Sequence, residues 1–385
     1  MSADARDRVL ALLRGAPLID GHNDLLYALR EARDERGEEL DVADPCPALQ
    51  TDLPRARAGG LGGQFWSVYV SSDLPPVEAV TRTLEQVDAL FALVARHPDR
   101  LALARTADEV ERVAASGRIA SMIGVEGGHS IGGSLGTLRI LARLGAGYLT
   151  LTHNDDTPWA DSATGEHPHG GLTTFGEEVV RELNRCGVLV DLSHVSDDTM
   201  RQAIEVSEAP VIFSHSSARA LADVTRNVPD DVLELTGRTG GVVMVTFVPS
   251  FTTTEGAAAN RAAWDETRKI RSEHPEDPAA AAAAVDAAFA ERGEVPAGVG
   301  DVADHVDHVR AVAGIDAIGV GGDFDGASSM PEGLEDVSGY PALFAELAAR
   351  GYADEDLTKI AGRNVLRAMR GSERTAARLR AERPR

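Results

Sequence analysis

Histidine and carboxylate side chains stand at the ends of several apolar stretches in this chain of 385 residues. His22 and Asp24 lie two residues apart where the run Leu18–His22 ends, so both side chains can point to the same side of extended backbone. Glu126 directly follows the run Ile119–Val125, where a buried carboxylate is costly unless it is paired or binds a metal ion. These residue types at these places predict a metal site.

Two further histidines end consecutive apolar runs, because His194 closes VLVDLSH and His215 closes VIFSHS. Imidazole and carboxylate groups are common zinc ligands, and together with His22, Asp24 and Glu126 the set offers five of them. Five ligands suit two zinc ions that share one ligand. We therefore assign His22 and Asp24 to one ion, His194 and His215 to the other, and Glu126 as the bridge between them.

Eight short apolar runs alternate with longer helical patterns, which is typical of repeated βα units and a parallel sheet. The sequence predicts a closed (β/α)8 TIM barrel, whose enzymes build their sites at the C-terminal ends of the strands. An open doubly wound sheet has the same repetition and differs by closure, but no phosphate-binding fingerprint supports it. The predicted strands are Leu18–His22, Phe65–Val70, Ile119–Val125, Tyr148–Thr152, Val188–Leu192, Val211–Ser214, Val242–Phe247 and Ala317–Gly321.

Helical patterns separate most of these strands, and Gly or Pro marks many of the joins. A long Ala-rich segment, about Thr254–Val309, predicts a helical insertion before the last strand, and not a second domain. Residues 1–385 are expected to form one domain with a charged C-terminal tail over about 372–385. The clearest predicted helices are Val77–Arg96, Thr106–Ser116, Leu135–Leu144, Thr174–Cys186 and Ser196–Val206.

The composition excludes some classes of partner. A formal net charge of −23 argues against nucleic acid and against an anionic membrane, since both need a basic surface. The two cysteines, Cys46 and Cys186, are too few for a disulfide framework. The N-terminal segment lacks the pattern of a secretory signal and no run of 18 apolar residues occurs, so we expect a soluble, cytoplasmic protein without a membrane anchor.

The strings around the candidate ligands resemble those of the membrane (renal-type) dipeptidase family of dinuclear zinc peptidases, which have amidohydrolase-like barrels. The resemblance spans about Pro17 to Arg370, and its motifs are highly specific as a set although each would be weak alone. The matching strings are DGHND, GGQFWSVYV, GVEGGHS, YLTLTHNDDTPWADS, VDLSHVS, FSHSSARAL, RNVPDD and GGDFDG followed by PEGLEDVS. The family's metal residues fall on the same five positions that the strand ends indicate.

The resemblance implies a zinc-dependent dipeptidase that tolerates a D-residue at the C-terminal position, and it leaves a homodimer open. The family's substrate-site residues fall on His153, Arg226 and Asp323. Asp323 is the expected general base, with Asp325 as the second candidate. His153 would polarise the scissile carbonyl, and the Arg226 guanidinium would hold the C-terminal carboxylate of the substrate.

Several alternatives stay open at this point. Tyr69 shares a strand face with Phe65, so it either reaches the substrate pocket or packs in the barrel core. Arg226 could form a surface salt bridge with the neighbouring Asp230 or Asp231. The chain could be another amidohydrolase acting on a small amide, or a catalytically silent metal-binding module.

Five other histidines, including His129, receive no catalytic role. His167 and His169 form a loop pair, and His305 and His308 share a face of a predicted helix. Both pairs are expected at the surface.

Overall fold

Eight parallel strands form a closed barrel in the computed structural model, which describes residues 3–273, 284, 288 and 295–382. Neighbouring strands pair in the order β2, β1, β9, β8, β7, β6, β5, β4, and a pairing between β2 and β4 closes the ring. The barrel strands are β1 (Leu18–Asn23), β2 (Leu61–Tyr69), β4 (Ile119–Glu126), β5 (Ala146–Thr150), β6 (Leu189–Asp191), β7 (Ile212–Phe213), β8 (Val242–Val245) and β9 (Ile318–Val320). The predicted barrel and all eight of its strands are confirmed.

One additional strand escaped the sequence analysis. β3 (Leu101–Leu103) pairs with the first residues of β4, outside the closed ring. Its three residues are too few to show the period of a strand.

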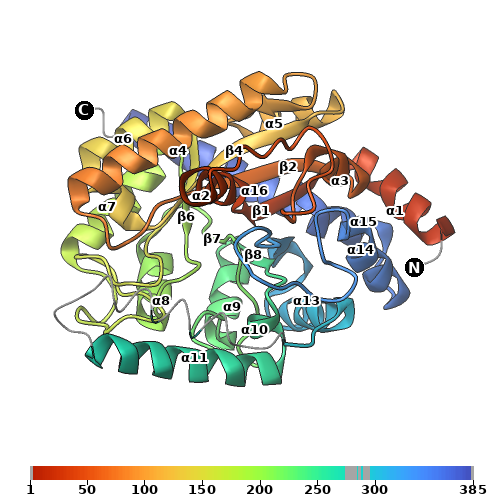
Figure 1. Ribbon diagram of the computed structural model, residues 1–385. Coiled ribbons are helices and arrows are strands. Elements are labelled where there is room, and N and C mark those ends of the chain that lie inside the picture. Colours follow the sequence, from red (N-terminus) through yellow and green to blue (C-terminus); the bar gives the residue numbers. More distant parts are fainter. Residues whose placement is uncertain (1–2, 274–283, 285–287, 289–294, 383–385) are drawn as a thin grey trace.

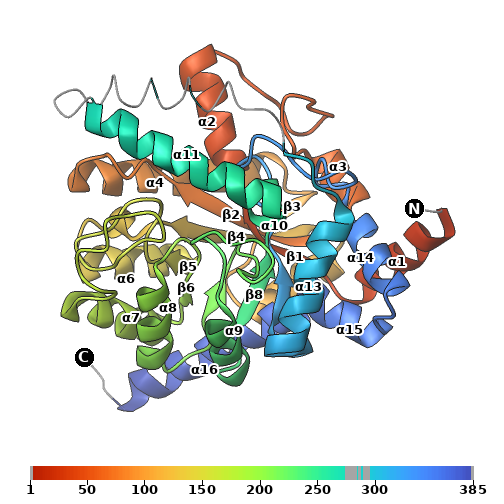
Figure 2. The same ribbon diagram turned by 90° about the horizontal axis from the view of Figure 1, so that it is seen from below.

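Helices surround the strands on the outside of the barrel (Figures 1 and 2). Each of the five helices predicted most clearly is present, with ends that differ from the prediction by at most one residue. Ser or Thr side chains cap several of them, as where Thr173 accepts a hydrogen bond from the backbone N–H of Gly176. The α-helices are α1 (Ala3–Gly15), α2 (Leu25–Arg36), α3 (Leu53–Ala58), α4 (Pro76–Arg96), α5 (Ala107–Ala115), α6 (Leu135–Leu144), α7 (Thr174–Cys186), α8 (Asp197–Val206), α9 (Asp230–Arg238), α10 (Pro249–Thr252), α11 (Thr254–Glu273), α13 (Val299–Ala313), α14 (Tyr340–Ala349), α15 (Asp354–Thr358) and α16 (Asn364–Glu382).

The barrel interior holds its own apolar cluster, to which seven strands contribute a buried side chain. This cluster continues into α16 through Val365, Leu366 and Met369, so α16 packs against one end of the barrel interior. The same helix takes in most of the charged tail, where Ala376 and Leu379 are buried. The strand residues of the cluster include Ile19, Phe65, Met122, Tyr148, Leu189, Ile212 and Met244.

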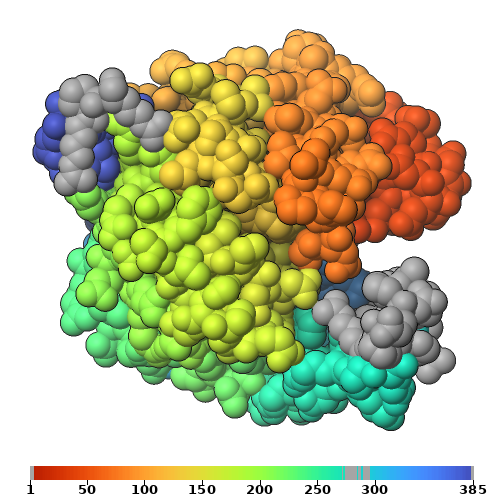
Figure 3. All heavy atoms as spheres, turned by 90° about the vertical axis from the view of Figure 1, so that its left-hand side faces the viewer, coloured from red at the N-terminus to blue at the C-terminus, as the bar shows by residue number. Residues whose placement is uncertain are grey.

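The predicted helical insertion between β8 and β9 begins with α10 and α11 and ends with α13, and the central part of Thr254–Val309 lies outside the described residues. Figure 3 shows α11 (teal) along the edge of the face formed by the segment that follows β5 (yellow to light green). Side chains of this segment and of α11, among them Thr164 and Trp264, line one cavity. Among the described helices, none is both long enough and apolar enough to cross a membrane.

The expectation of a surface position is wrong for His305, which is fully buried. Its Nδ1 accepts a hydrogen bond from the backbone N–H of Ala218 at 3.0 Å, and its Nε2 donates to the carbonyl of Thr252 at 3.1 Å. His305 and His308 are three residues apart on one face of α13, but only His308 is partly exposed, and it contacts Asp230. His305 therefore links α13 to the segment after β7 and to the end of α10.

His305 should make the protein sensitive to acid. Burial lowers the pKa of His305 to about 4, because the charged ring would lose its hydration. The hydrogen bond from Ala218 to Nδ1 also requires the neutral ring. The unfolded chain takes up the proton near the ordinary value of 6.5, so the stabilisation is complete above that pH and is lost as the pH falls towards 4. Between pH 8 and 4.5, the unfolding free energy of the wild type should fall by about 2 to 3 kcal/mol more than that of His305→Gln. Equal losses in urea titrations of the two proteins would contradict this.

Candidate active site

The nine candidate site residues gather at the C-terminal ends of the barrel strands. His22 is the penultimate residue of β1, Tyr69 ends β2 and Glu126 ends β4. Five others lie just after strands: Asp24, His153, His194, His215 and Asp323. Arg226 lies further along the segment between β7 and α9. The positions that sequence analysis inferred one by one are therefore brought together by the closure of the barrel.

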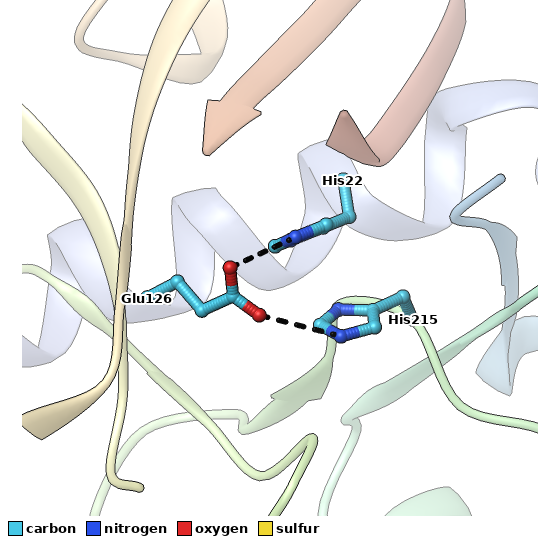
Figure 4. A group of neighbouring side chains, drawn as sticks. All are labelled: His22, Glu126 and His215. Carbon is cyan, nitrogen blue, oxygen red and sulfur yellow. Dashed lines mark ion pairs between the residues drawn. The ribbon is translucent and has the colours of Figure 1, made fainter. Parts of the chain in front are cut away.

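Glu126 lies at the centre of this group, between the rings of His22 and His215 (Figure 4). Its Oε2 lies 3.3 Å from the Nε2 of His22, and its Oε1 lies 3.2 Å from the Nε2 of His194 and 3.7 Å from the Nε2 of His215. Oε2 thus faces His22, and Oε1 faces His194 and His215. This is the arrangement a bridging carboxylate needs.

The donor atoms of the site converge within metal-binding distance of one another. Three overlapping groups have ligand atoms that lie within 4.8 Å of one another: His22 with Glu126 and His215, Glu126 with His153 and His194, and His22 with Asp24 and Asp323. The Nε2 of His22 is buried and has no hydrogen-bond partner, and the Nε2 atoms of His194 and His215 lie only 2.9 Å apart. Orphaned and crowded imidazole nitrogens of this kind fit a site for cations.

Charges inside the cluster are strongly coupled. Burial would raise the pKa of Glu126, but His22 and the hydrogen bond from His194 outweigh it and hold that pKa well below its usual value. Burial likewise opposes protonation of His22, yet the oxygens of Tyr148, Glu126 and Asp24 raise the pKa of His22 well above its usual value. Burial lowers the pKa values of His194 and His215. The carboxylate is ionised and two of the rings are neutral, which are the forms that bind metals.

Tyr148 orients His22 and was not expected at the site. Its hydroxyl lies 2.8 Å from the Nδ1 of His22 and donates to the carbonyl of Gly21 at 3.2 Å. A side chain at Gly124 on the neighbouring strand would collide with the Tyr148 ring, so this glycine makes room for it.

Another unexpected contact is the hydroxyl of Ser67, which donates to Oε2 of Glu126 at 2.9 Å. Ser67 lies two residues before Tyr69 on the same face of β2, so strand periodicity could have identified it.

Asp323 lies beside His22 and Asp24 in an unusual backbone conformation. Its φ is +64°, and its N–H donates to the carbonyl of His22 at 3.2 Å. Within the described part of the chain, four non-glycine residues have positive φ, and three of them, His194, Asp323 and Asp325, belong to the loops that carry this cluster. Burial raises the pKa of Asp323 well above its usual value, and Asp24 and Glu126 act in the same direction. A carboxyl group with a raised pKa is better suited to accept a proton than one at its usual value.

Asp325 forms hydrogen bonds with Gln50, outside the histidine cluster. Its Oδ1 accepts a hydrogen bond from the backbone N–H of Gln50 at 2.7 Å, and its own N–H donates to Oε1 of Gln50 at 2.7 Å. Burial raises the pKa of Asp325 to about 6, but its contacts tie it to the Gln50 loop and not to the histidine cluster. Asp323 is therefore the better placed of the two aspartates.

His153 and Tyr69 form the more open side of the cluster. The side chain of His153 is 15% exposed, whereas those of His22 and His215 are at most 1% exposed. The ring centroid of Tyr69 lies 4.5 Å from that of His153, and burial raises the pKa of the Tyr69 hydroxyl, which stays neutral. Tyr69 thus reaches the site and does not lie in the barrel core. Burial lowers the pKa of His153, so its neutral ring can donate one hydrogen bond.

Arg226 is buried beside the cluster without an acidic partner. Asp231 pairs with Arg201 and Asp230 pairs with His308, and among the described residues no carboxylate forms an ion pair with Arg226. Among the described residues, its guanidinium makes two long hydrogen bonds of 3.4 Å, to the hydroxyl of Ser216 and the carbonyl of His215, and lies over the Phe251 ring at 5.2 Å, while its Nε has no hydrogen-bond partner. Burial lowers the pKa of Arg226 to about 10, so it carries its charge at neutral pH. A buried, unpaired guanidinium is suited to a carboxylate ligand.

Comparison with known proteins agrees with this geometry. The profile of the membrane dipeptidases (peptidase family M19) matches residues 6–383. The probable dipeptidase PvdM from Pseudomonas aeruginosa shares 25% identity, with a TM-score of 0.83 over 98% of this chain and all of that chain. The dipeptidase AC, an M19 metallopeptidase, shares 28% identity, with a TM-score of 0.75 over 93% of this chain and 98% of that chain.

A third relative was solved with a ligand. A metallopeptidase from Rhodobacter sphaeroides, bound to a phosphinate mimic of the dipeptide L-Ala-D-Ala, shares 27% identity, with a TM-score of 0.76 over 93% of this chain and 99% of that chain. Family match and structural likeness both extend over nearly the whole chain. The chain belongs to the membrane dipeptidase family, peptidase family M19, and is a metallo-dipeptidase with a TIM-barrel fold.

Proposed function

We propose that this protein is a dinuclear zinc dipeptidase that hydrolyses small dipeptides with a free C-terminal carboxylate and accepts a D-residue at that position. The observation that carries the proposal is the buried, unpaired guanidinium of Arg226 next to a five-residue metal-binding set. A guanidinium in that place binds a carboxylate close to the reacting bond, which favours substrates as short as dipeptides.

The proposed ligands divide between the two oxygens of Glu126. His22 and Asp24 lie on the Oε2 side, and His194 and His215 lie on the Oε1 side, so each side offers two ligands besides the shared carboxylate. Bound zinc ions would supply Lewis acidity and a nucleophile at neutral pH. Imidazole and carboxylate donors at this spacing match the preferences of zinc.

The chain's own residues supply the remaining steps. The Asp323 carboxylate accepts a proton from the attacking water and delivers it to the nitrogen of the leaving amine. A neutral His153 donates a hydrogen bond to the developing oxyanion, and Tyr69 lies against it to form the wall of the substrate pocket. Arg226 holds the substrate carboxylate and thereby orients the scissile bond.

Tolerance of a D-residue rests on the resemblance and on the relative with a bound L-Ala-D-Ala mimic. A panel of dipeptides that varies the stereochemistry at both positions tests it. L-Ala-D-Ala should be cleaved at a rate within about tenfold of L-Ala-L-Ala, a barrier difference of about 1.4 kcal/mol. Exclusive cleavage of L,L-dipeptides would remove D-tolerance from the proposal while leaving the dipeptidase activity in place.

The metal content tests the bridging role of Glu126. The zinc-saturated wild type should contain two zinc ions per chain, because five ligands with one shared carboxylate satisfy two sites. Glu126→Gln should lose zinc from both sites together, giving less than one ion per chain after dialysis. Elemental analysis of the two proteins is the measurement.

Glu182→Gln is the matched control, since Glu182 is also a buried glutamate but lies on α7 near Arg139 and Arg185. It should keep both ions. Full occupancy in Glu126→Gln, or one ion in the saturated wild type, would contradict the dinuclear assignment.

A further inference from the structure

His215 is connected to a buried aspartate through one serine hydroxyl. The Nδ1 of His215 lies 2.8 Å from the Oγ of Ser214, and that Oγ lies 2.7 Å from Oδ2 of Asp191. Asp191, Ser214 and His215 are all at most 1% exposed. Asp191 comes from β6 and His215 follows β7, so the contact joins two neighbouring strand ends.

Asp191 has a complete set of donors. Its Oδ1 accepts the backbone N–H groups of Ser214 at 2.8 Å and Ser193 at 3.2 Å, and its Oδ2 accepts the hydroxyls of Thr150 at 2.6 Å and Ser214 at 2.7 Å. Four hydrogen bonds to the ionised form oppose the rise in the pKa of Asp191 that burial causes. An ionised carboxylate only accepts hydrogen bonds, so each contacting hydroxyl must direct its hydrogen towards Asp191.

This requirement determines the protonation of the His215 ring. The Ser214 hydroxyl has one hydrogen, and Oδ2 of Asp191 at 2.7 Å is a nearer and charged acceptor than the Oγ of Ser193 at 3.4 Å, so towards His215 the same oxygen can only accept. Nδ1 of His215 must therefore carry the ring hydrogen. Nε2 is left with its lone pair, and this is the nitrogen that faces Glu126 and His194.

We propose that Asp191, acting through Ser214, is a positioning residue that holds His215 in the tautomer able to bind metal through Nε2. The metal-binding part of this inference rests on the proposed function, whereas the tautomer does not. His22 has a similar contact, in which Tyr148 donates to the carbonyl of Gly21 and accepts from Nδ1 of His22, but there no carboxylate is involved. The two histidines on opposite sides of Glu126 are thus held by different hydroxyl groups.

Asp191→Asn should reverse the direction of the two hydrogen bonds that connect residue 191 to Ser214 and Ser214 to His215. The two backbone N–H groups on Oδ1 need an acceptor, so the amide oxygen of asparagine takes that place and its NH₂ group takes the place of Oδ2. The NH₂ group then donates to Ser214, whose own hydrogen is free to turn towards Nδ1 of His215. The ring hydrogen moves to Nε2, where it blocks metal binding.

The experiment uses ¹⁵N NMR of the histidine-labelled, metal-free full chain, which distinguishes the two neutral tautomers, together with zinc affinity measured by competition with a chelator. In the wild type, His215 should carry its hydrogen on Nδ1. In Asp191→Asn, the hydrogen should move to Nε2 and zinc affinity should fall by about 10- to 100-fold, the usual effect of losing a partner that orients a ligand.

Thr150→Val is the matched control, because Thr150 donates to the same Oδ2 of Asp191 but does not contact His215. It should leave both the tautomer and the zinc affinity unchanged. If Asp191→Asn does not fold, Ser214→Ala serves instead: without the acceptor on Nδ1, His215 should populate both tautomers, and Ser214→Thr, which keeps the hydroxyl, should restore the Nδ1–H form.

An Nδ1–H tautomer that persists in Asp191→Asn or in Ser214→Ala would overturn the proposal. So would equal losses of zinc affinity in Asp191→Asn and Thr150→Val. Neither readout needs dipeptide turnover, so a protein that shows the tautomer change but cleaves no dipeptide would contradict the proposed function alone.

Discussion

Asp323→Asn should lower kcat for dipeptide hydrolysis by about 10²- to 10⁴-fold, the usual contribution of a positioned acid–base group, while both zinc ions stay bound. The amide keeps the size of the side chain but cannot accept and return a proton. Burial and the neighbouring Asp24 and Glu126 raise the pKa of Asp323, which suits it to proton exchange and not to a permanent negative charge. Steady-state kinetics and metal analysis on the same preparation are the measurements, and KM should change little.

Asp316→Asn serves as the control, because Asp316 is an exposed carboxylate shortly before β9 that pairs with Lys359. It should retain the wild-type kcat. If Asp323→Asn also retains nearly normal kcat, proton transfer belongs to another group, and Asp325 becomes the next residue to test despite its contacts with Gln50.

Arg226→Met should act mainly on kcat/KM, because it removes the group proposed to hold the substrate carboxylate but leaves the proposed metal ligands in place. Loss of a charge-assisted contact to a buried guanidinium corresponds to about 2 to 3 kcal/mol, or about 30- to 150-fold in kcat/KM. The wild type should strongly prefer a dipeptide with a free C-terminus over its C-terminal amide. The variant should discriminate much less between the two, because the free carboxylate no longer has a partner.

Arg367→Met provides the comparison, since Arg367 is a half-buried arginine on α16 whose guanidinium contacts the carbonyls of Gly240 and Asp316. It should keep the preference for a free carboxylate. An Arg226→Met enzyme with undiminished preference would show that another group recognises the C-terminus.

The barrel could be predicted from the sequence because its strands are buried on both faces. A run such as Val242–Val245 is then continuously apolar and stands out from the helical patterns around it. The metal-binding candidates could be predicted for a related reason. Burial of a polar residue such as Glu126 or His215 at the end of an apolar run costs free energy unless the side chain has a partner or binds a metal. Closure of the barrel then placed them together.

Contacts across the barrel could not be predicted in this way. Tyr148 reaches His22 from a position 126 residues away, and no local pattern marks it as different from other buried aromatic residues. The same holds for His305, whose helical periodicity is compatible with exposure until the segment at Ala218 and the end of α10 at Thr252 are placed against it. Strand β3 was missed because three residues are too few to show a period.

For Arg226, the sequence indicated a possible role but not the partners of its side chain. The sequence placed it beside Asp230 and Asp231, so a surface salt bridge was a reasonable alternative. Only the structure reveals that both aspartates have other partners and that the guanidinium is buried. Side-chain partners in loops depend on tertiary packing, which neighbouring residues in the sequence do not determine.

The central claim, that this chain cleaves dipeptides with two zinc ions, is tested most directly by titrating metal-free protein with zinc while following hydrolysis of L-Ala-D-Ala and L-Ala-L-Ala. Turnover of at least one dipeptide should reach its plateau at two zinc ions per chain, disappear on addition of a chelator and return with fresh zinc. Absence of turnover of both dipeptides at saturating zinc, or a plateau at one ion per chain, would contradict the account.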